Sequence, residues 1–244
     1  MSRWPDDWIL PDWPAHPRVR ACVTTRAGGI SQVPFDGFNL GIHVGDAPDA
    51  VSANRQSLQQ IVSCEPAWLN QVHSSLAVEA DPGGCPTGDA SWTAQSGIAC
   101  AVLTADCLPV LLTDREGTRV AAAHAGWRGL AAGILEATVA AMETPGDQLM
   151  AWLGPAIGPS AFEVGGEVRD AFVSQHAEAS RAFVPSPNAG RFLADLYQLA
   201  RVRLSASGVS AVHGGGFCTV TDPRFYSYRR AALTGRFASL VWLV

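Results

Sequence analysis

The sequence predicts an α+β fold. Its candidate strands and helices follow one another without the strict alternation that is typical of a doubly wound parallel sheet. An apolar run at Ile98–Thr104 indicates a buried strand, and a predicted β-hairpin follows it directly. Hydrophobic residues make up 48% of the 244 positions and charged residues 16%, which is ample for a core. Because no linker or internal repeat interrupts the chain, residues 1–244 are predicted to form a single domain.

The N-terminal part is predicted to hold one strand, one helix and two short extended segments. Residues 19–25 have the pattern of a strand that enters a glycine-rich loop. Pro48–Val62 has the apolar spacing of a helix, and Asp46 or Asp49 is expected to cap it. The extended segments are at 67–73 and 76–79.

The remainder begins with the hairpin, which consists of strands 108–113 and 118–123 around the polar turn Asp114-Arg115-Glu116-Gly117. Gly126 is expected to end the second strand, and 127–142 has the spacing of one amphipathic helix. The other predicted elements are a strand at Leu149–Leu153, helices near 167–176 and 191–207 with Gly208 closing the latter, and strands at 209–212 and 239–244.

The hairpin brings a cysteine and a histidine together. With the turn centred between Arg115 and Glu116, residues whose numbers sum to 231 face each other, and Cys107 and His124 form such a pair. Directly opposed residues of an antiparallel pair have Cβ atoms about 5 Å apart. That separation suits a thiolate and an imidazole that share a metal ion, and it also suits a thiol next to its general base.

Three kinds of chemistry fit this pair. A catalytic zinc site has three protein ligands and one open position, and His73, in the context Asn70-Gln71-Val72-His73, would supply the third ligand if the fold brings it near. Copper is the alternative metal, since His and Cys ligands also suit a blue-copper site, but a multicopper oxidase is disfavoured because the chain has only six histidines and no His-x-His pair. A metal-free cysteine hydrolase would use Cys107 as nucleophile and His124 as base, and would leave His73 without a role. The zinc deaminase signature is absent, so Asp106 is the nearest candidate for an acid–base group.

Charge and targeting patterns exclude several classes of function. The formal net charge is −5, and no basic cluster indicates nucleic acid or an anionic membrane as a partner. The N-terminus lacks the pattern of a signal peptide, and no apolar run reaches the length of a membrane span, so a cytoplasmic location is expected. The six cysteines include no Cys-x-x-Cys pair and are expected to be reduced thiols.

Arginines are the best candidates for binding an anion. Arg26 precedes a glycine pair, Arg128 lies in a predicted first helical turn, and Arg229 follows an aromatic stretch. Arginine binds phosphate or carboxylate through two parallel hydrogen bonds. A cation in a first helical turn is unfavourable unless an anion meets it, which singles out Arg128. No P-loop or dinucleotide-binding motif is present.

Many ordered motifs resemble one family from about residue 22 to the C-terminus: the YfiH-like purine nucleoside phosphorylases, also called multicopper polyphenol oxidases or laccases. The motifs include Thr24-Thr25-Arg26, Asn39-Leu40-Gly41, His43-Val44-Gly45-Asp46, Asn70-Gln71-Val72-His73, Gly88-Asp89-Ala90, Ala105-Asp106-Cys107, His124-Ala125-Gly126-Trp127-Arg128-Gly129 and Tyr226-Ser227-Tyr228-Arg229-Arg230.

The resemblance implies a fold of packed mixed β-sheets flanked by helices, with residues 1–18 as an N-terminal extension. It implies a catalytic Zn²⁺ on His73, Cys107 and His124. It also implies phosphorolysis of adenosine, inosine and methylthioadenosine, with purine nucleoside and phosphate as partners and adenosine deamination as a second activity. Asp106 is a candidate proton relay. The candidate substrate-binding residues are Arg26, Asn39, His43, Gln71, Arg128 and Arg229.

Two other hypotheses remain open. Some members of the family are linked to peptidoglycan precursor editing, so a cysteine hydrolase or amidase that acts on such a precursor is the rival enzyme. A non-enzymatic binding factor that merely retains the pocket is the third possibility.

Overall fold

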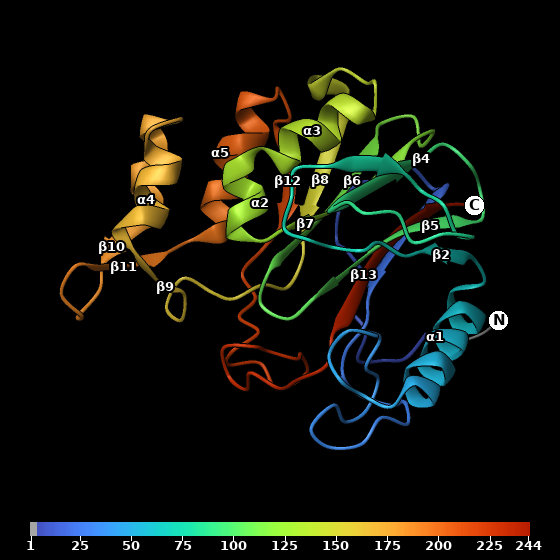
Figure 1. Cartoon of the computed structure of the whole chain (residues 1–244). Coiled ribbons are helices and arrows are strands. Elements are labelled where there is room, and N and C mark those ends of the chain that lie inside the picture. Colours follow the sequence, from blue (N-terminus) through green and yellow to red (C-terminus); the bar gives the residue numbers. More distant parts are fainter. Residues whose placement is uncertain (1–3) are drawn as a thin grey trace.

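Two β-sheets pack face to face, and helices cover their outer faces (Figure 1). This arrangement comes from a computed structural model, which describes residues 4–244. The layer between the sheets is apolar and includes Val102, Leu111, Phe225, Phe237 and Val241, all buried. The predicted α+β class, with packed mixed sheets flanked by helices, is confirmed.

The first sheet has four strands. Their spatial order is β1 (Val19–Val23), β13 (Phe237–Leu243), β5 (Ile98–Thr104) and β2 (Glu65–Ala67). β13 is antiparallel to both of its neighbours, whereas β2 and β5 are parallel. The single helix α1 (Pro48–Val62) covers the outer face, because its apolar side packs against alternate residues of β5 and β13.

The second sheet has six strands and forms the centre of the molecule. Its order is β12 (Ala211–Gly214), β8 (Leu149–Leu153), β6 (Leu108–Asp114), β7 (Val120–Ala125), β4 (Ala90–Thr93) and β3 (Ala77–Glu79). Three helices cover its outer face: α2 (Trp127–Ala132), α3 (Ile134–Ala141) and α5 (Leu196–Ala206).

A smaller unit projects at the left of Figure 1. It consists of an antiparallel sheet in the order β10 (Phe183–Pro185), β11 (Arg191–Ala194) and β9 (Glu163–Gly165), together with α4 (Gly166–Val173). Two short 3₁₀ helices, Gly146–Gln148 and Ala177–Ala182, complete the elements.

Side chains between residue 4 and β1 pack onto the first sheet. The ring of Trp4 stacks on that of Trp242 with centroids 5.7 Å apart, Trp8 is buried, and Ile9 forms a β-bridge with Val23. The separation into an extension at 1–18 and a core from residue 19 stays a prediction. Among residues 4–244, no helix is both long and apolar enough to cross a membrane.

Several predicted elements are confirmed, and others are wrong for identifiable reasons. The bounds of α1, β5 and β8 match. The predicted helix 127–142 is two helices, because Gly133 adopts a left-handed conformation (φ 95°) that breaks the hydrogen-bond ladder. The predicted helix 191–207 begins as strand β11, and the helix starts only after Asp195, whose carboxylate accepts the N–H groups of Tyr197 and Gln198.

The expected cap of α1 is also wrong. Ala47 is the N-cap residue and makes no side-chain cap. Asp46 lies one residue too early, and its carboxylate accepts the N–H of Ala47 instead. Of the two short extended segments, 67–73 forms a strand only at its start, whereas 76–79 contains β3.

The predicted hairpin register is wrong by two residues. Pro109 faces His124, so partners sum to 233 and not to 231. The reason is a longer loop, in which the Asp114 carboxylate accepts the N–H groups of Thr118 and Arg119, so that the last residue pair of the ladder is Thr113 and Val120. A shift of two keeps every side chain on the predicted face of the sheet.

Candidate metal centre and substrate cavity

Three ligand atoms meet where two loops approach the end of β7. His73 comes from the irregular segment after β2, Cys107 from the turn between β5 and β6, and His124 from β7. All three ligand atoms lie within 4.8 Å of one another. The Cys107 Sγ is 3.8 Å from His73 Nε2, and the two imidazole rings are 4.7 Å apart, nearly perpendicular. The predicted trio is therefore together, although Cys107 reaches His124 diagonally across the hairpin and not directly.

Glycine at position 126 makes this diagonal approach possible. The observed register, continued by one residue, places Cys107 opposite Gly126. A Cβ at Gly126 would lie 2.8 Å from the Cys107 Sγ and 3.2 Å from His73 Cδ2. Only a residue without a side chain leaves space for both ligands. Gly126 also ends β7, as predicted.

A buried carboxylate organises the site. Asp89, fully buried at the edge of β4, receives the His124 Nδ1 hydrogen bond at 2.8 Å. It also accepts the N–H groups of Val72, His73 and Ser74, at 3.2, 3.0 and 2.5 Å. Asp89 thereby fixes the ring of one ligand and the backbone of another. His73 itself has φ 60°, a conformation that is rare outside glycine and that these bonds hold in place.

The same contacts set the protonation states. Burial by itself would raise the pKa of Asp89, but the hydrogen bonds from His124 and Ser74 outweigh it and hold the pKa well below its usual range. Burial also opposes ionisation of Cys107, yet His124 and then His73 lower the pKa of its thiol to about 6. Burial would lower the pKa of His124, but the Cys107 thiolate and Asp89 raise it to about 9. The geometry therefore favours a thiolate at neutral pH, the form in which cysteine binds metals.

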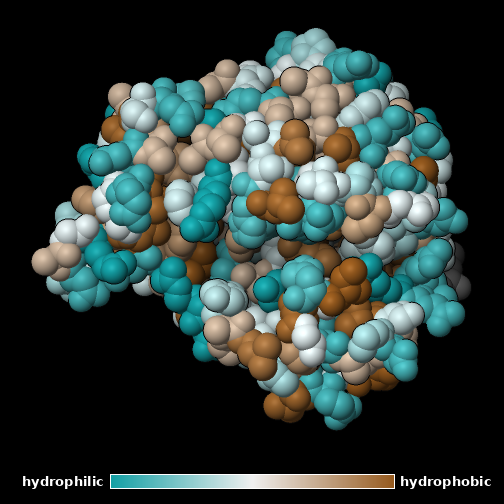
Figure 2. Space-filling view, viewed as in Figure 1, coloured by the Kyte–Doolittle hydropathy of each residue, from teal (hydrophilic) through white to brown (hydrophobic). Residues whose placement is uncertain are grey.

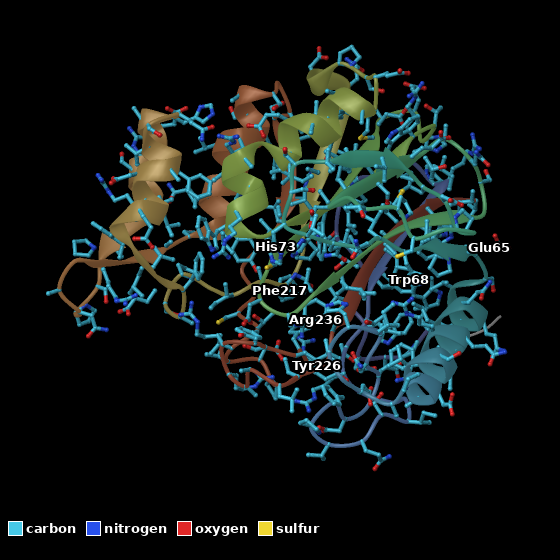
Figure 3. All side chains as sticks on the ribbon, viewed as in Figure 1. Glu65, Trp68, His73, Phe217, Tyr226 and Arg236 are labelled. Carbon is cyan, nitrogen blue, oxygen red and sulfur yellow. The ribbon has the colours of Figure 1, made fainter. Side chains whose placement is uncertain are left out.

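The trio lies in the wall of a cavity of about 440 Å³. Figure 2 shows the surface hollowed near the middle of the view, with hydrophobic side chains beside the hollow. In Figure 3, His73 and Arg236 lie one above the other at this place. The other lining residues are His43, Gln71, Leu103, Thr104, Ala105, Asp106, Trp127, Arg128, Ile157, Phe162, Leu196, Tyr228 and Arg229.

The structure brings four of the six predicted substrate-binding residues to this cavity: His43, Gln71, Arg128 and Arg229. Their availability differs. The amide of Gln71 is committed to the backbone of Leu103, with which it exchanges two hydrogen bonds. Arg229 donates to the carbonyls of Ala161 and Glu163. Arg128 is exposed, and its guanidinium lies 4.6 Å from the Trp127 ring, so it is the freer of the two arginines.

The other two predicted binding residues lie outside the cavity wall. Arg26 pairs with Asp36 at 2.8 Å. Asn39 is fully buried and binds Asp46, and its side-chain oxygen accepts the N–H of Arg236. These contacts give both residues a structural role, and neither side chain is placed to touch a molecule in the cavity.

Asp106 ties two loops to the turn that carries Cys107. One carboxylate oxygen accepts the Thr219 hydroxyl and the other accepts the N–H of Arg229, each at 2.6 Å. Its φ of 92° is left-handed. Both oxygens are thus engaged in positioning neighbours of the site, and its role as proton relay stays a prediction.

Two residues of the site were not predicted. Asp89 belongs to the motif Gly88-Asp89-Ala90, but nothing in its local sequence indicates that it binds His124, 35 positions away. Arg236 lines the cavity and belongs to no arginine pattern in the sequence. Both depend on contacts between distant segments, which residue spacing does not reveal.

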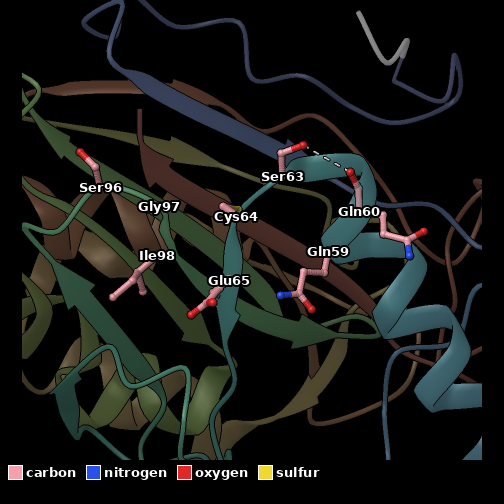
Figure 4. A pocket seen from close by; sticks show the side chains of 8 residues that line it. All are labelled: Gln59, Gln60, Ser63, Cys64, Glu65, Ser96, Gly97 and Ile98. Atoms are coloured by element: carbon pink, nitrogen blue, oxygen red, sulfur yellow. Dashed lines mark hydrogen bonds between the residues drawn. The ribbon is translucent and has the colours of Figure 1, made fainter.

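A second hollow lies at the opposite end of the first sheet (Figure 4). It measures about 620 Å³ and is lined by the end of α1 and the segments around Glu65 and Gly97. It is larger than the metal-site cavity, but its described lining contains no predicted site residue and no cluster of metal-ligand atoms.

Comparison with known proteins is consistent over nearly the whole chain. A family model described as multi-copper polyphenol oxidoreductase laccase matches residues 20–244. A purine nucleoside phosphorylase of Pseudomonas aeruginosa is 68% identical over 237 residues, which cover 97% of this chain and 98% of that protein. The purine nucleoside phosphorylase YfiH of Escherichia coli K12 is 51% identical, with 97% and 98% covered. This chain belongs to the YfiH family.

Solved structures agree with this YfiH-family assignment. A crystal structure from Neisseria meningitidis superposes with a TM-score of 0.95 at 53% identity, covering 98% of this chain and 99% of that one. YlmD from Geobacillus stearothermophilus gives a TM-score of 0.92 at 27% identity, with 99% and 97% covered. The resemblance stated from the sequence motifs is confirmed.

Proposed function

We propose that this YfiH-family chain is a zinc-dependent purine nucleoside phosphorylase that acts on adenosine, inosine and methylthioadenosine and deaminates adenosine as a side reaction. One observation carries the proposal: His73, Cys107 and His124 converge in the wall of a cavity that also presents three arginines. The phosphorylase names of the 68% and 51% identical relatives support the choice of reaction.

The donor set fits zinc. Two imidazoles and one thiolate make three ligands, the number that catalytic zinc sites provide while keeping a fourth position open. The hydrogen bond between His124 Nδ1 and Asp89 leaves Nε2 as the donor atom, which is the usual carboxylate support of a metal-binding histidine. When bound, the metal would polarise a substrate oxygen or lower the pKa of water. Multicopper chemistry is disfavoured because it needs many more imidazoles than the six histidines of the chain supply.

The residues of the chain supply binding and charge. In phosphorolysis the bond between C1′ of ribose and the purine nitrogen breaks, and a phosphate oxygen bonds to C1′. The products are the free base, which gains a proton, and ribose 1-phosphate. Trp127, Phe162 and Tyr228 offer apolar ring surfaces for the purine, and the cavity arginines balance the charge of phosphate. Deamination would instead consume water and convert adenosine into inosine and ammonia.

One observation favours a second candidate, a cysteine hydrolase or amidase that acts on a peptidoglycan precursor. Asp89, His124 and Cys107 stand in the order of an acid, base and nucleophile triad, and the thiol pKa is lowered. His73 has no role in such a triad, although it lies 3.8 Å from the nucleophile. A metal site uses all three residues, which is why we prefer it.

The test is a screen of adenosine, inosine and methylthioadenosine with and without phosphate, with free base, ribose 1-phosphate and inosine as readouts. The proposal predicts base and ribose 1-phosphate in equal amounts, only when phosphate is present, and loss of both in Cys107→Ser. Full turnover by a chelated, zinc-free protein would contradict it. Release of a peptide or amine through a covalent intermediate on Cys107, without nucleoside cleavage, would instead identify the hydrolase.

A further inference from the structure

Arg236 lines the cavity, is held in place by hydrogen bonds, and forms no salt bridge among residues 4–244. It is half-buried, just before β13. Its N–H donates to Asn39 Oδ1 at 2.8 Å, and its guanidinium donates to the carbonyls of Thr234 and Gly235, each at 2.9 Å. Its stem packs on Gly41, where a Cβ would lie 2.8 Å from the Arg236 Cγ. The side chain is therefore held in place before any ligand arrives, which reduces the entropy cost of binding.

No carboxylate pairs with this guanidinium among residues 4–244. Arg26, by contrast, pairs with Asp36, and both terminal nitrogens of Arg229 are turned to carbonyl groups. Burial lowers the pKa of Arg236, and the charges of Cys107 and Asp106 oppose this shift without forming a salt bridge with the guanidinium. A bound anion would stabilise this half-buried cation further. Both side-chain hydrogen bonds come from Nη1 of Arg236, so Nε and Nη2 have no hydrogen-bond partner among residues 4–244.

Three other side chains lie near Arg236: His43 and Thr104, which line the cavity, and Arg55, which does not. Burial first, and then the charges of Arg236 and Arg55, lower the pKa of His43, so this imidazole in the cavity wall is neutral at pH 7 and can donate a hydrogen bond. Arg55 stacks on the Trp68 ring at 4.1 Å and likewise has no acidic partner in the described chain. Thr104 lines the cavity and is paired with Phe237 on the neighbouring strand. Its buried hydroxyl has no hydrogen-bond partner in residues 4–244. A buried hydroxyl without a partner is costly, and a bound oxygen or water would satisfy it.

We infer that Arg236 seats a phosphoryl dianion in the cavity, with Arg55 adding to the positive field around it and the His43 imidazole offering a hydrogen bond. The inference rests on the proposed function, for which the dianion is the phosphate that attacks C1′. It replaces the earlier candidates Arg26 and Arg229, whose guanidinium groups are already occupied. It also leaves the exposed Arg128 at the outer rim. The 5′-phosphate of a nucleotide has the same chemistry as free phosphate, so the test must separate the two sources.

The experiment compares Arg236→Gln, Arg236→Lys and the wild type, all loaded with zinc. Arg181→Gln is the matched control, because Arg181 is an exposed arginine of the 3₁₀ helix Ala177–Ala182 and does not line the cavity. Binding of inorganic phosphate is measured by calorimetry, and KM is measured separately for phosphate and for inosine. Losing a charge-assisted fork predicts a roughly 10- to 100-fold weaker phosphate affinity and a similar rise in the phosphate KM for Arg236→Gln. The inosine KM should change less than about threefold, and Arg236→Lys should restore part of the affinity.

The outcomes separate the inference from the proposed function. An unchanged phosphate affinity and KM in Arg236→Gln would overturn the inference while leaving phosphorolysis intact. If the wild type binds phosphate through Arg236 but cleaves no nucleoside, the seat stands and the proposed function fails. Adenosine 5′-monophosphate tests the source: an Arg236-dependent preference of tenfold or more over adenosine would support the seat and assign it to a nucleotide. A larger loss of phosphate affinity in Arg128→Gln than in Arg236→Gln would contradict the assignment.

Discussion

The Asp89 carboxylate holds together residues that the chain supplies from separate segments. It accepts hydrogen bonds from the ring of one ligand and the backbone of another, and it is fully buried. Because its pKa is lower in the folded state, the ionised carboxylate stabilises the fold above its ordinary pKa of about 3.9. That contribution is lost as the pH falls below this value toward the folded pKa.

Asp89→Asn should therefore lower both stability and metal affinity. We expect the metal-free variant to lose about 1–3 kcal/mol of unfolding free energy at pH 7, and the difference from wild type to shrink as the pH falls below about 4. Zinc affinity should fall about 10- to 100-fold, because the support of His124 is weakened. Denaturant titrations and zinc competition measure the two effects. Asp81→Asn, in an exposed turn, is the control, and an equal effect in that variant would contradict the account.

The Cys107 thiol should ionise at a much lower pH than an ordinary cysteine thiol. In metal-free protein, its alkylation rate should rise with pH to half of its maximum at about pH 6, because His124 and His73 stabilise the thiolate against the effect of burial. Peptide mass spectrometry after iodoacetamide pulses at graded pH follows this single thiol. Cys64, whose pKa burial raises to about 12, should stay unlabelled throughout. A midpoint for Cys107 near pH 8–9 would show that the histidines do not face it as described.

Strands and loops bring the ligands together through two backbone features. The β6–β7 hairpin shifts by two residues because Asp114 enlarges its loop, and Gly126 then lies opposite Cys107. The prediction of a four-residue turn placed Cys107 and His124 on the correct face of the hairpin, but directly opposite each other and not diagonally. Turn chemistry decides the length of a hairpin loop, and a single Asp side chain is enough to change it.

Gly126→Ala tests this arrangement. The added methyl group would approach the Cys107 sulfur to 2.8 Å, so one ligand must move. We expect zinc affinity to fall by about tenfold or more, while the circular dichroism spectrum stays that of the wild type. Gly166→Ala is the control, because its Cβ would meet nothing within 4 Å and its position begins α4. Unchanged zinc binding in Gly126→Ala would be inconsistent with the observed register.

Across the whole molecule, helices and strands with a clear hydrophobic pattern were predictable from the sequence, whereas contacts between distant segments were not. The bounds of α1, β5 and β8 follow from apolar runs and spacing. The break at Gly133 and the strand β11 were missed because helical spacing continues through both, and only tertiary contacts override it. At the site, the metal trio was predicted from local contexts and the resemblance. Asp89 and Arg236 were not, because they act through partners 35 and 197 positions away.

The proposed function depends most on a zinc ion held by His73, Cys107 and His124. The direct measurement is the metal content of protein purified without added metal, taken together with its phosphate-dependent cleavage of inosine. We predict about one zinc per wild-type chain, almost none in His73→Ala or Cys107→Ser, and activity that a chelator removes and zinc restores. A wild-type protein without bound zinc that cleaves inosine at full rate in the presence of chelator would contradict it.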